Sequence, residues 1–194
     1  IDGVNPMNNG ESYTQLSPDH KRIVRHSFKT GKEIATVFDV ETARGAKKLP
    51  CIDGYIMSPD EHRILIQTET KGIYRRSYTA VYYIYDVRNN TLEPLSEGGP
   101  QQVPLFSPDG NVIAFARGNN IFLVKLLFGN AEVQVTKDGK FNEVINGLPD
   151  WVNEEEFTTN RSFDFSADSK VLAWVRYDES QVPIYSMQEF KGLS

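Results

Sequence analysis

The chain has 194 residues, a formal net charge of −5 at pH 7 and one cysteine, and 39% of its residues are hydrophobic. This composition supports a buried core, and the acidic balance without a long Lys/Arg run argues against a nucleic-acid-binding surface. A single cysteine excludes an intrachain disulfide, and three scattered histidines without ligand spacing predict no metal site and no cofactor.

A turn signature recurs four times along the chain. Its copies are Ser17-Pro18-Asp19, Ser58-Pro59-Asp60, Ser107-Pro108-Asp109 and Ser166-Ala167-Asp168. Proline presets the backbone for a tight turn, and serine and aspartate side chains bond to nearby backbone amides. The repeat therefore predicts four copies of one strand-turn-strand unit.

Short apolar runs surround each turn at the same places. The run before the turn lies at residues 13–16, 54–57, 103–106 and 163–165. The run after the turn lies at residues 23–24, 64–66, 112–115 and 171–175. A third run follows at residues 34–38, 81–85, 121–124 and 183–185, and a polar fourth run at residues 92–95 and 132–135.

Four short strands in units of about 40 to 60 residues are the period of a β-propeller blade. We therefore expect an all-β fold, a partial β-propeller with about four consecutive four-stranded antiparallel blades. The blades would span roughly residues 10–50, 51–98, 99–146 and 147–194. A sandwich or a long meander is the alternative, although a sandwich would not repeat one turn in every unit. Four blades rarely close a ring, so a larger propeller is expected.

The segment at residues 150–157, Asp-Trp-Val-Asn-Glu-Glu-Glu-Phe, is the one helix candidate and an insertion into the fourth unit. Asp150 is suited to cap it, and Trp151 and Phe157 are expected to pack inward. Three adjacent carboxylates repel one another, so such a run is either a solvated turn or a place where a cation docks.

The turn repeat, the segment Arg75-Arg76-Ser77-Tyr78-Thr79-Ala80 and the acidic segment occur in an order that resembles the N-terminal region of the dipeptidyl peptidase IV family. The resemblance covers about residues 55–185. It implies an eight-bladed propeller and a C-terminal α/β-hydrolase domain with a Ser-Asp-His triad. It also implies release of dipeptides from peptide N-termini, with Pro or Ala in second position.

The same resemblance assigns roles to three residues. It implies that Glu155 and Glu156 hold the substrate α-ammonium, and that Arg75 binds a substrate carbonyl oxygen. Adjacent helical residues point about 100° apart, so Glu154 should face away or make structural bonds. Two departures from the family pattern are Asn153, where an aromatic residue is often found, and Arg76, which leaves open which arginine points inward.

No Gly-x-Ser-x-Gly elbow occurs in the sequence. Together with the resemblance, this implies a piece of a longer serine peptidase, with no catalytic residue here and no activity of its own. The expected partners are peptides with a free N-terminus and the hydrolase domain of the same polypeptide, in a homodimer. The expected location is the periplasm, cell envelope or exterior of a bacterium, with no targeting segment in these residues.

Two other functions remain open from the sequence. One is a noncatalytic β-propeller scaffold that binds proteins, which has no need of paired carboxylates with an arginine partner. The other is a clan relative with endopeptidase or acylaminoacyl peptidase specificity, which would not need to bind a free ammonium.

Overall fold

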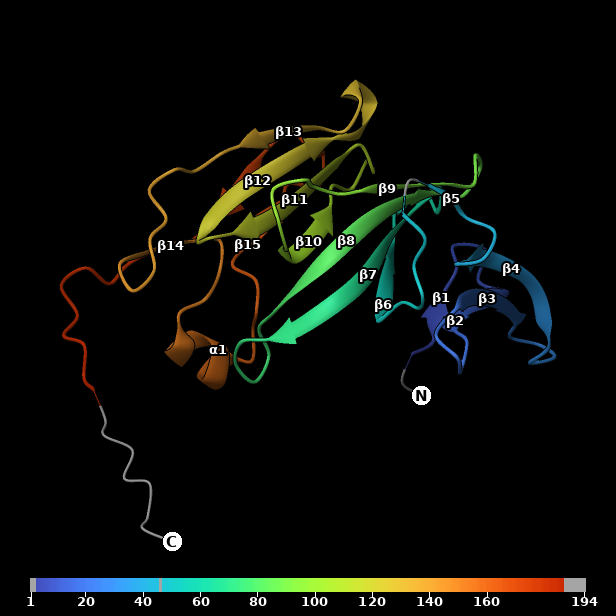
Figure 1. Ribbon diagram of the computed structural model, residues 1–194, viewed down its shortest axis with the longest axis horizontal. Helices are drawn as coiled ribbons and strands as arrows, with labels where there is room; N and C mark the ends of the chain where they lie inside the picture. Colours follow the sequence, from blue (N-terminus) through green and yellow to red (C-terminus); the bar gives the residue numbers. More distant parts are fainter. Residues whose placement is uncertain (1–2, 46, 187–194) are drawn as a thin grey trace, which may run out of the picture.

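The computed structural model describes residues 3–45 and 47–186, and this part of the chain folds mostly into β-strands. The sheets follow one another along the chain and lie side by side across the molecule (Figure 1). Almost every strand pairs antiparallel with its neighbour in sequence. The prediction of an all-β fold built from successive antiparallel sheets is therefore confirmed.

Two sheets have the expected four strands in sequential order. The strands of the first sheet are β1 (Asn5–Pro6), β2 (Ser12–Leu16), β3 (Arg22–Ser27) and β4 (Glu33–Asp39). The strands of the third sheet are β10 (Gln102–Phe106), β11 (Val112–Arg117), β12 (Asn120–Lys125) and β13 (Ala131–Gln134). A short 3₁₀ turn, η1 (Leu126–Phe128), joins β12 to β13.

The second sheet has five strands in the described part of the chain, in the order β5-β9-β8-β7-β6. They are β5 (Arg44–Gly45), β6 (Gly54–Met57), β7 (Arg63–Gly72), β8 (Tyr78–Asp86) and β9 (Thr91–Pro94). The added strand β5 pairs parallel with β9, although it lies within the residues expected to form the first blade. The connection between two sheets thus supplies a fifth strand, which a count of apolar runs does not detect.

The last part of the chain forms two short strand pairs and a helix. The elements are β14 (Val144–Asn146), α1 (Trp151–Phe157), β15 (Phe163–Phe165), β16 (Leu172–Trp174) and β17 (Arg176–Asp178). β14 pairs with β17, and β15 pairs with β16. The prediction of a strand at residues 183–185 is wrong: Ile184 and Tyr185 are 76% and 89% exposed, and no strand among residues 3–45 and 47–186 pairs with them.

The core lies between neighbouring sheets. Ile64 and Ile66 on β7 pack towards the first sheet, in a cluster with Phe38. Leu65, between them in sequence, packs towards the third sheet, in a cluster with Phe115. Successive side chains of a strand point to opposite faces, so a strand covered on both faces needs an unbroken apolar run. The stacking of the second sheet between two others therefore explains the run at residues 64–66.

All four predicted turns have the same hydrogen bonds. In each turn the serine hydroxyl donates to the aspartate carboxylate at 2.6 Å. That hydroxyl also accepts from the backbone N–H five residues later, and the aspartate accepts from the N–H two residues after itself. Ala167 replaces proline in the fourth copy without changing the pattern. The serine and the aspartate, rather than the proline, therefore define this turn.

These turns make stability depend on pH. The hydroxyl of Ser107 and the backbone amide of Asn111 hold the pKa of Asp109 below its ordinary value, and serine bonds do the same for Asp19 and Asp168. A carboxylate with a lowered pKa stabilises the fold above its unfolded pKa, and this stabilisation is lost as pH falls through the folded pKa. We expect the free energy of unfolding to be flat above about pH 5 and to fall below about pH 4.

Urea unfolding between pH 3 and 7 measures this dependence. Asp109→Asn keeps an oxygen acceptor in the turn and removes the titrating group, so its free energy of unfolding should fall less steeply with acid. An acid slope identical to that of the unsubstituted protein would contradict the role given to the turn aspartate.

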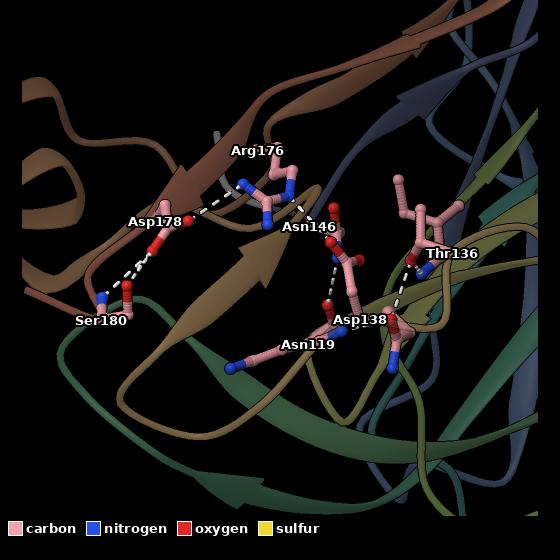
Figure 2. Close-up of polar contacts among 10 residues, drawn as sticks. Asn119, Thr136, Asp138, Asn146, Arg176, Asp178 and Ser180 are labelled. Atoms are coloured by element: carbon pink, nitrogen blue, oxygen red, sulfur yellow. Dashed lines mark hydrogen bonds and ion pairs between the residues drawn. The ribbon is translucent and has the colours of Figure 1, made fainter.

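A polar network holds the end of the third sheet against β14 and β17, as Figure 2 shows. Asp138 Oδ2 accepts from Arg176 Nε at 2.8 Å, and Asp138 Oδ1 accepts from Asn146 Nδ2 at 2.8 Å. The same Asn146 nitrogen donates to the carbonyl of Asn119 at 3.2 Å. Arg176 Nη1 also lies 3.4 Å from Asp178. These contacts anchor β14, the strand from which the α1 segment leaves, and its partner strand β17.

Candidate functional site

Helix α1 begins with the expected cap. Asp150 Oδ1 accepts hydrogen bonds from the backbone N–H of Asn153 at 2.7 Å and from its side-chain amide at 2.8 Å. The helix ends at Phe157, after which Thr158 adopts a left-handed conformation with φ of 55°. The prediction of a short capped helix in the acidic segment is confirmed.

The prediction that Trp151 and Phe157 pack inward is wrong, because they are 60% and 72% exposed. The helix has seven residues, and Glu154 is its one buried member. The helix lies beside the hairpin of β7 and β8 (Figure 1), and its apolar residues Trp151, Val152 and Phe157 are all exposed. A polar contact, rather than apolar packing, therefore attaches this helix.

The hairpin of β7 and β8 carries the upstream arginines to the helix. β7 has ten residues and β8 has nine, whereas the other strands have two to seven. Extended strands rise about 3.3 Å per residue, so this hairpin reaches beyond its own sheet. The tip closes with hydrogen bonds from the N–H groups of Ile73 and Tyr74 to the carbonyl of Ser77. Arg75 and Arg76 lie at this tip.

Glu154 joins the helix to the hairpin tip. Its side chain is buried, with 2% of the residue exposed. Its Oε1 accepts hydrogen bonds from the backbone N–H groups of Arg76 at 2.8 Å and of Ser77 at 2.9 Å. The expectation that Glu154 faces away from the other two glutamates or makes structural bonds is met by these two bonds.

Arg75 lies next to the second glutamate of the run. Its Nη1 is 3.4 Å from Glu155 Oε2, with the arginine side chain 72% exposed and the glutamate side chain 27% exposed. An ion pair at this distance with an exposed arginine and a partly exposed glutamate contributes little to folding, between about 0 and 1 kcal/mol. Both groups therefore remain available to a ligand.

Glu156 and Arg76 are exposed and, among the described residues, their side chains have no ion pair or hydrogen bond. Arg76 contacts the helix only through its backbone N–H. The structure thus brings Arg75 to Glu155 across 80 positions of sequence and leaves Glu156 beside them on the helix.

A cavity of about 340 Å³, which the sequence did not indicate, lies between the hairpin tip and the N-terminal part of α1. Its lining includes Tyr74, Phe141, Trp151 and Glu154, but not Arg75 or the other two glutamates. A larger cavity of about 580 Å³ lies at the first two sheets, and no predicted site residue lines it. The exposure of three aromatic residues around the smaller cavity has no separate signal in the sequence pattern.

Within residues 3–45 and 47–186, no group of three or more His, Cys, Asp or Glu side chains is arranged to hold a metal ion. No helix in that part of the chain is long and apolar enough to cross a membrane. The charged groups of the site are carboxylates and guanidinium groups, which recognise opposite charge and carbonyl oxygens.

The sequence is similar to those of known proteins. The family described as "Dipeptidyl peptidase IV (DPP IV) N-terminal region" matches residues 58–194. "Probable dipeptidyl-aminopeptidase B" of Colletotrichum graminicola is 42% identical over 137 residues, which are 69% of this chain and 15% of the relative. "Prolyl endopeptidase FAP" of Homo sapiens is 32% identical over 177 residues, which are 90% of this chain and 22% of the relative.

The fold also matches a solved structure. The crystal structure of dipeptidyl peptidase 4 of Porphyromonas gingivalis superposes with a TM-score of 0.91 and 46% sequence identity. The match covers 97% of this chain and 27% of that chain. The chain therefore spans between about 15% and 27% of the length of these relatives.

Proposed function

Because the chain belongs to the family of dipeptidyl peptidase IV N-terminal regions, we propose that it is the substrate-recognition part of a serine exopeptidase. The enzyme releases Xaa-Pro or Xaa-Ala dipeptides from peptide N-termini. The sheets described above are the N-terminal part of its propeller, which has eight blades. The triad lies in an α/β-hydrolase domain of the same polypeptide.

The observation that carries this proposal is the contact of Arg75 Nη1 with Glu155 Oε2 at 3.4 Å. The two residues come from a hairpin tip and a helix that are far apart in sequence, and both are exposed enough to meet a ligand. An arginine beside two accessible carboxylates can bind a carbonyl oxygen and an ammonium group at the same time. A peptide N-terminus carries both groups within its first residue.

Electrostatics explains why such a site selects the N-terminus. A peptide α-ammonium has a pKa near 7.7 to 8.0, so it is mostly charged at neutral pH. Hydrogen bonds from it to Glu155 and Glu156 are charge-assisted, each contributing roughly 1.5 to 3 kcal/mol. An internal peptide segment has no cation to offer, and its binding would desolvate the carboxylates without a partner. With the N-terminus held in this way, the nucleophile attacks the peptide bond that follows the second residue of the substrate.

Arg75 has a different part in the proposal. Its guanidinium group presents several N–H donors in a rigid plane, which suits a carbonyl oxygen of the bound dipeptide. Arg75 therefore orients the substrate backbone, while the glutamates recognise the free N-terminus.

A prolyl endopeptidase is the second candidate function, because the relative from Homo sapiens carries that name and matches 90% of this chain. An endopeptidase cleaves within a peptide and has no requirement for a free ammonium. The two candidates therefore differ in how they treat a peptide whose N-terminus is blocked.

A comparison of free and N-acetylated Xaa-Pro substrates with the full-length enzyme tests the proposal. Acetylation removes the cation, so two charge-assisted bonds are lost and kcat/KM should fall at least about 100-fold. Equal cleavage of both substrates would contradict the ammonium clamp and favour the endopeptidase. An enzyme with no activity on either substrate would contradict both functions.

A further inference from the structure

Glu154 is the glutamate of the run to which the proposed ammonium clamp gives no role. It is also the buried one, with 2% of the residue exposed. A buried carboxylate is costly unless hydrogen bonds satisfy it. Here its Oε1 accepts from two adjacent backbone amides, those of Arg76 and Ser77, at 2.8 Å and 2.9 Å. Two adjacent amides that converge on one oxygen hold the hairpin tip in a single position relative to the helix.

The held segment is the one that carries Arg75. Arg76 directly follows Arg75, and the tip is otherwise closed by the carbonyl of Ser77, which accepts from Ile73 and Tyr74. The Arg75 side chain itself is 72% exposed, so its own packing does not fix its place. The position of the guanidinium group beside Glu155 therefore depends on the backbone that Glu154 holds.

We propose that Glu154 is a positioning residue, which aligns Arg75 with Glu155 and Glu156 by fixing the hairpin tip to helix α1. The inference rests on the proposed function of those three residues. In this assignment Glu154 acts through the hairpin tip rather than on the substrate: it borders the smaller cavity, but 2% of the residue is exposed and its Oε1 accepts from the two amides. The acidic run thus has two tasks: one carboxylate builds the site and the next two bind the ligand.

Two conservative variants of the full-length enzyme separate position from charge. Glu154→Gln keeps an oxygen at the same reach and removes the charge, whereas Glu154→Asp keeps the charge and withdraws the oxygen by about 1.5 Å. A positioning role predicts that Glu154→Gln keeps kcat/KM within about threefold. It predicts that Glu154→Asp lowers kcat/KM about 10- to 100-fold, because small misplacements of binding groups have effects of that size. The opposite order would overturn the proposal in favour of a charge role.

The loss of kcat/KM in Glu154→Asp should arise from a misplaced Arg75. We expect Glu154→Asp to lower kcat more than it raises KM, and to leave the preference for a free over an acetylated N-terminus within about threefold of wild type. In a protein that already carries Arg75→Ala, adding Glu154→Asp should lower kcat/KM by less than about a further threefold. Losses that multiply fully in the double variant would show that Glu154 acts independently of Arg75 and would overturn the inference.

Hydrogen exchange gives a readout that does not depend on activity. Glu154→Asp should speed exchange of the Arg76 and Ser77 amides at least about tenfold, while amides of the core strand β11 keep their protection. Glu41→Gln is the matched control, since Glu41 is an exposed glutamate in the turn that follows β4 of the first sheet. Unchanged exchange at the hairpin tip would overturn the proposal. If Arg75→Ala and the Glu155 and Glu156 variants are themselves fully active, the proposed function fails instead.

Discussion

Glu155→Ala and Glu156→Ala are each expected to lower kcat/KM of the full-length enzyme on free Xaa-Pro peptides roughly 30- to 900-fold. This corresponds to a loss of about 2 to 4 kcal/mol of transition-state stabilisation. Each substitution removes one charge-assisted bond to the substrate ammonium and leaves the remaining carboxylate to hold it alone. Steady-state kinetics on a chromogenic Xaa-Pro substrate measures the loss. The same variants should discriminate less between free and acetylated substrates than the wild-type enzyme does.

Folding should change little in these two variants. Glu155 is partly exposed and Glu156 is exposed, and neither holds a backbone amide among the described residues. Thermal unfolding within a few degrees of wild type, together with full activity of the surface control Glu41→Gln, would attribute the loss to binding. Glu variants that keep full activity on free peptides would refute the ammonium clamp. Arg75→Ala should lower turnover and affect the recognition of the free N-terminus less.

Phe115→Ala is expected to reduce the free energy of unfolding by about 3 to 5 kcal/mol. Phe115 is fully buried on β11, and its ring stacks on Phe122 with centroids 5.4 Å apart. It belongs to the cluster that joins the second and third sheets. Its loss leaves a cavity between two sheets, which rigid strands on both sides cannot close. Urea unfolding followed by circular dichroism measures the change.

Phe128→Ala is the matched control for this prediction. Phe128 is a phenylalanine of the same sheet region on η1, and it is 73% exposed. Its replacement should change the free energy of unfolding by less than about 0.5 kcal/mol. If the two variants lose equal stability, the core between the second and third sheets is not where the stability of this fold resides.

The repeated turn could be predicted from the sequence because its chemistry is local. The serine and aspartate of each copy bond to each other and to amides within five residues, so no distant contact is needed. The cap at Asp150 is local in the same way, since its partner is Asn153. The short apolar runs and these turns together predicted the antiparallel sheets, and the cap at Asp150 predicted the start of the acidic helix.

Elements without a local signal were decided by the tertiary structure. Strand β5 exists because the connection after the first sheet runs along β9. Residues 183–185 have the composition of a strand and no described partner to pair with, so they form none. Trp151 and Phe157 stay exposed because the helix is attached through Glu154 instead of through an apolar face.

For the candidate site, too, some features could be predicted from the sequence and others depend on the tertiary structure. The acidic run and the arginine pair are visible in the sequence, and their pairing there rests on a family resemblance. Only the stacking of the sheets and the length of the β7–β8 hairpin bring Arg75 within 3.4 Å of Glu155. A helix period can say that three adjacent glutamates point in different directions. Which of the three is buried depends on where the hairpin tip lies, and the tertiary structure assigns that place to Glu154.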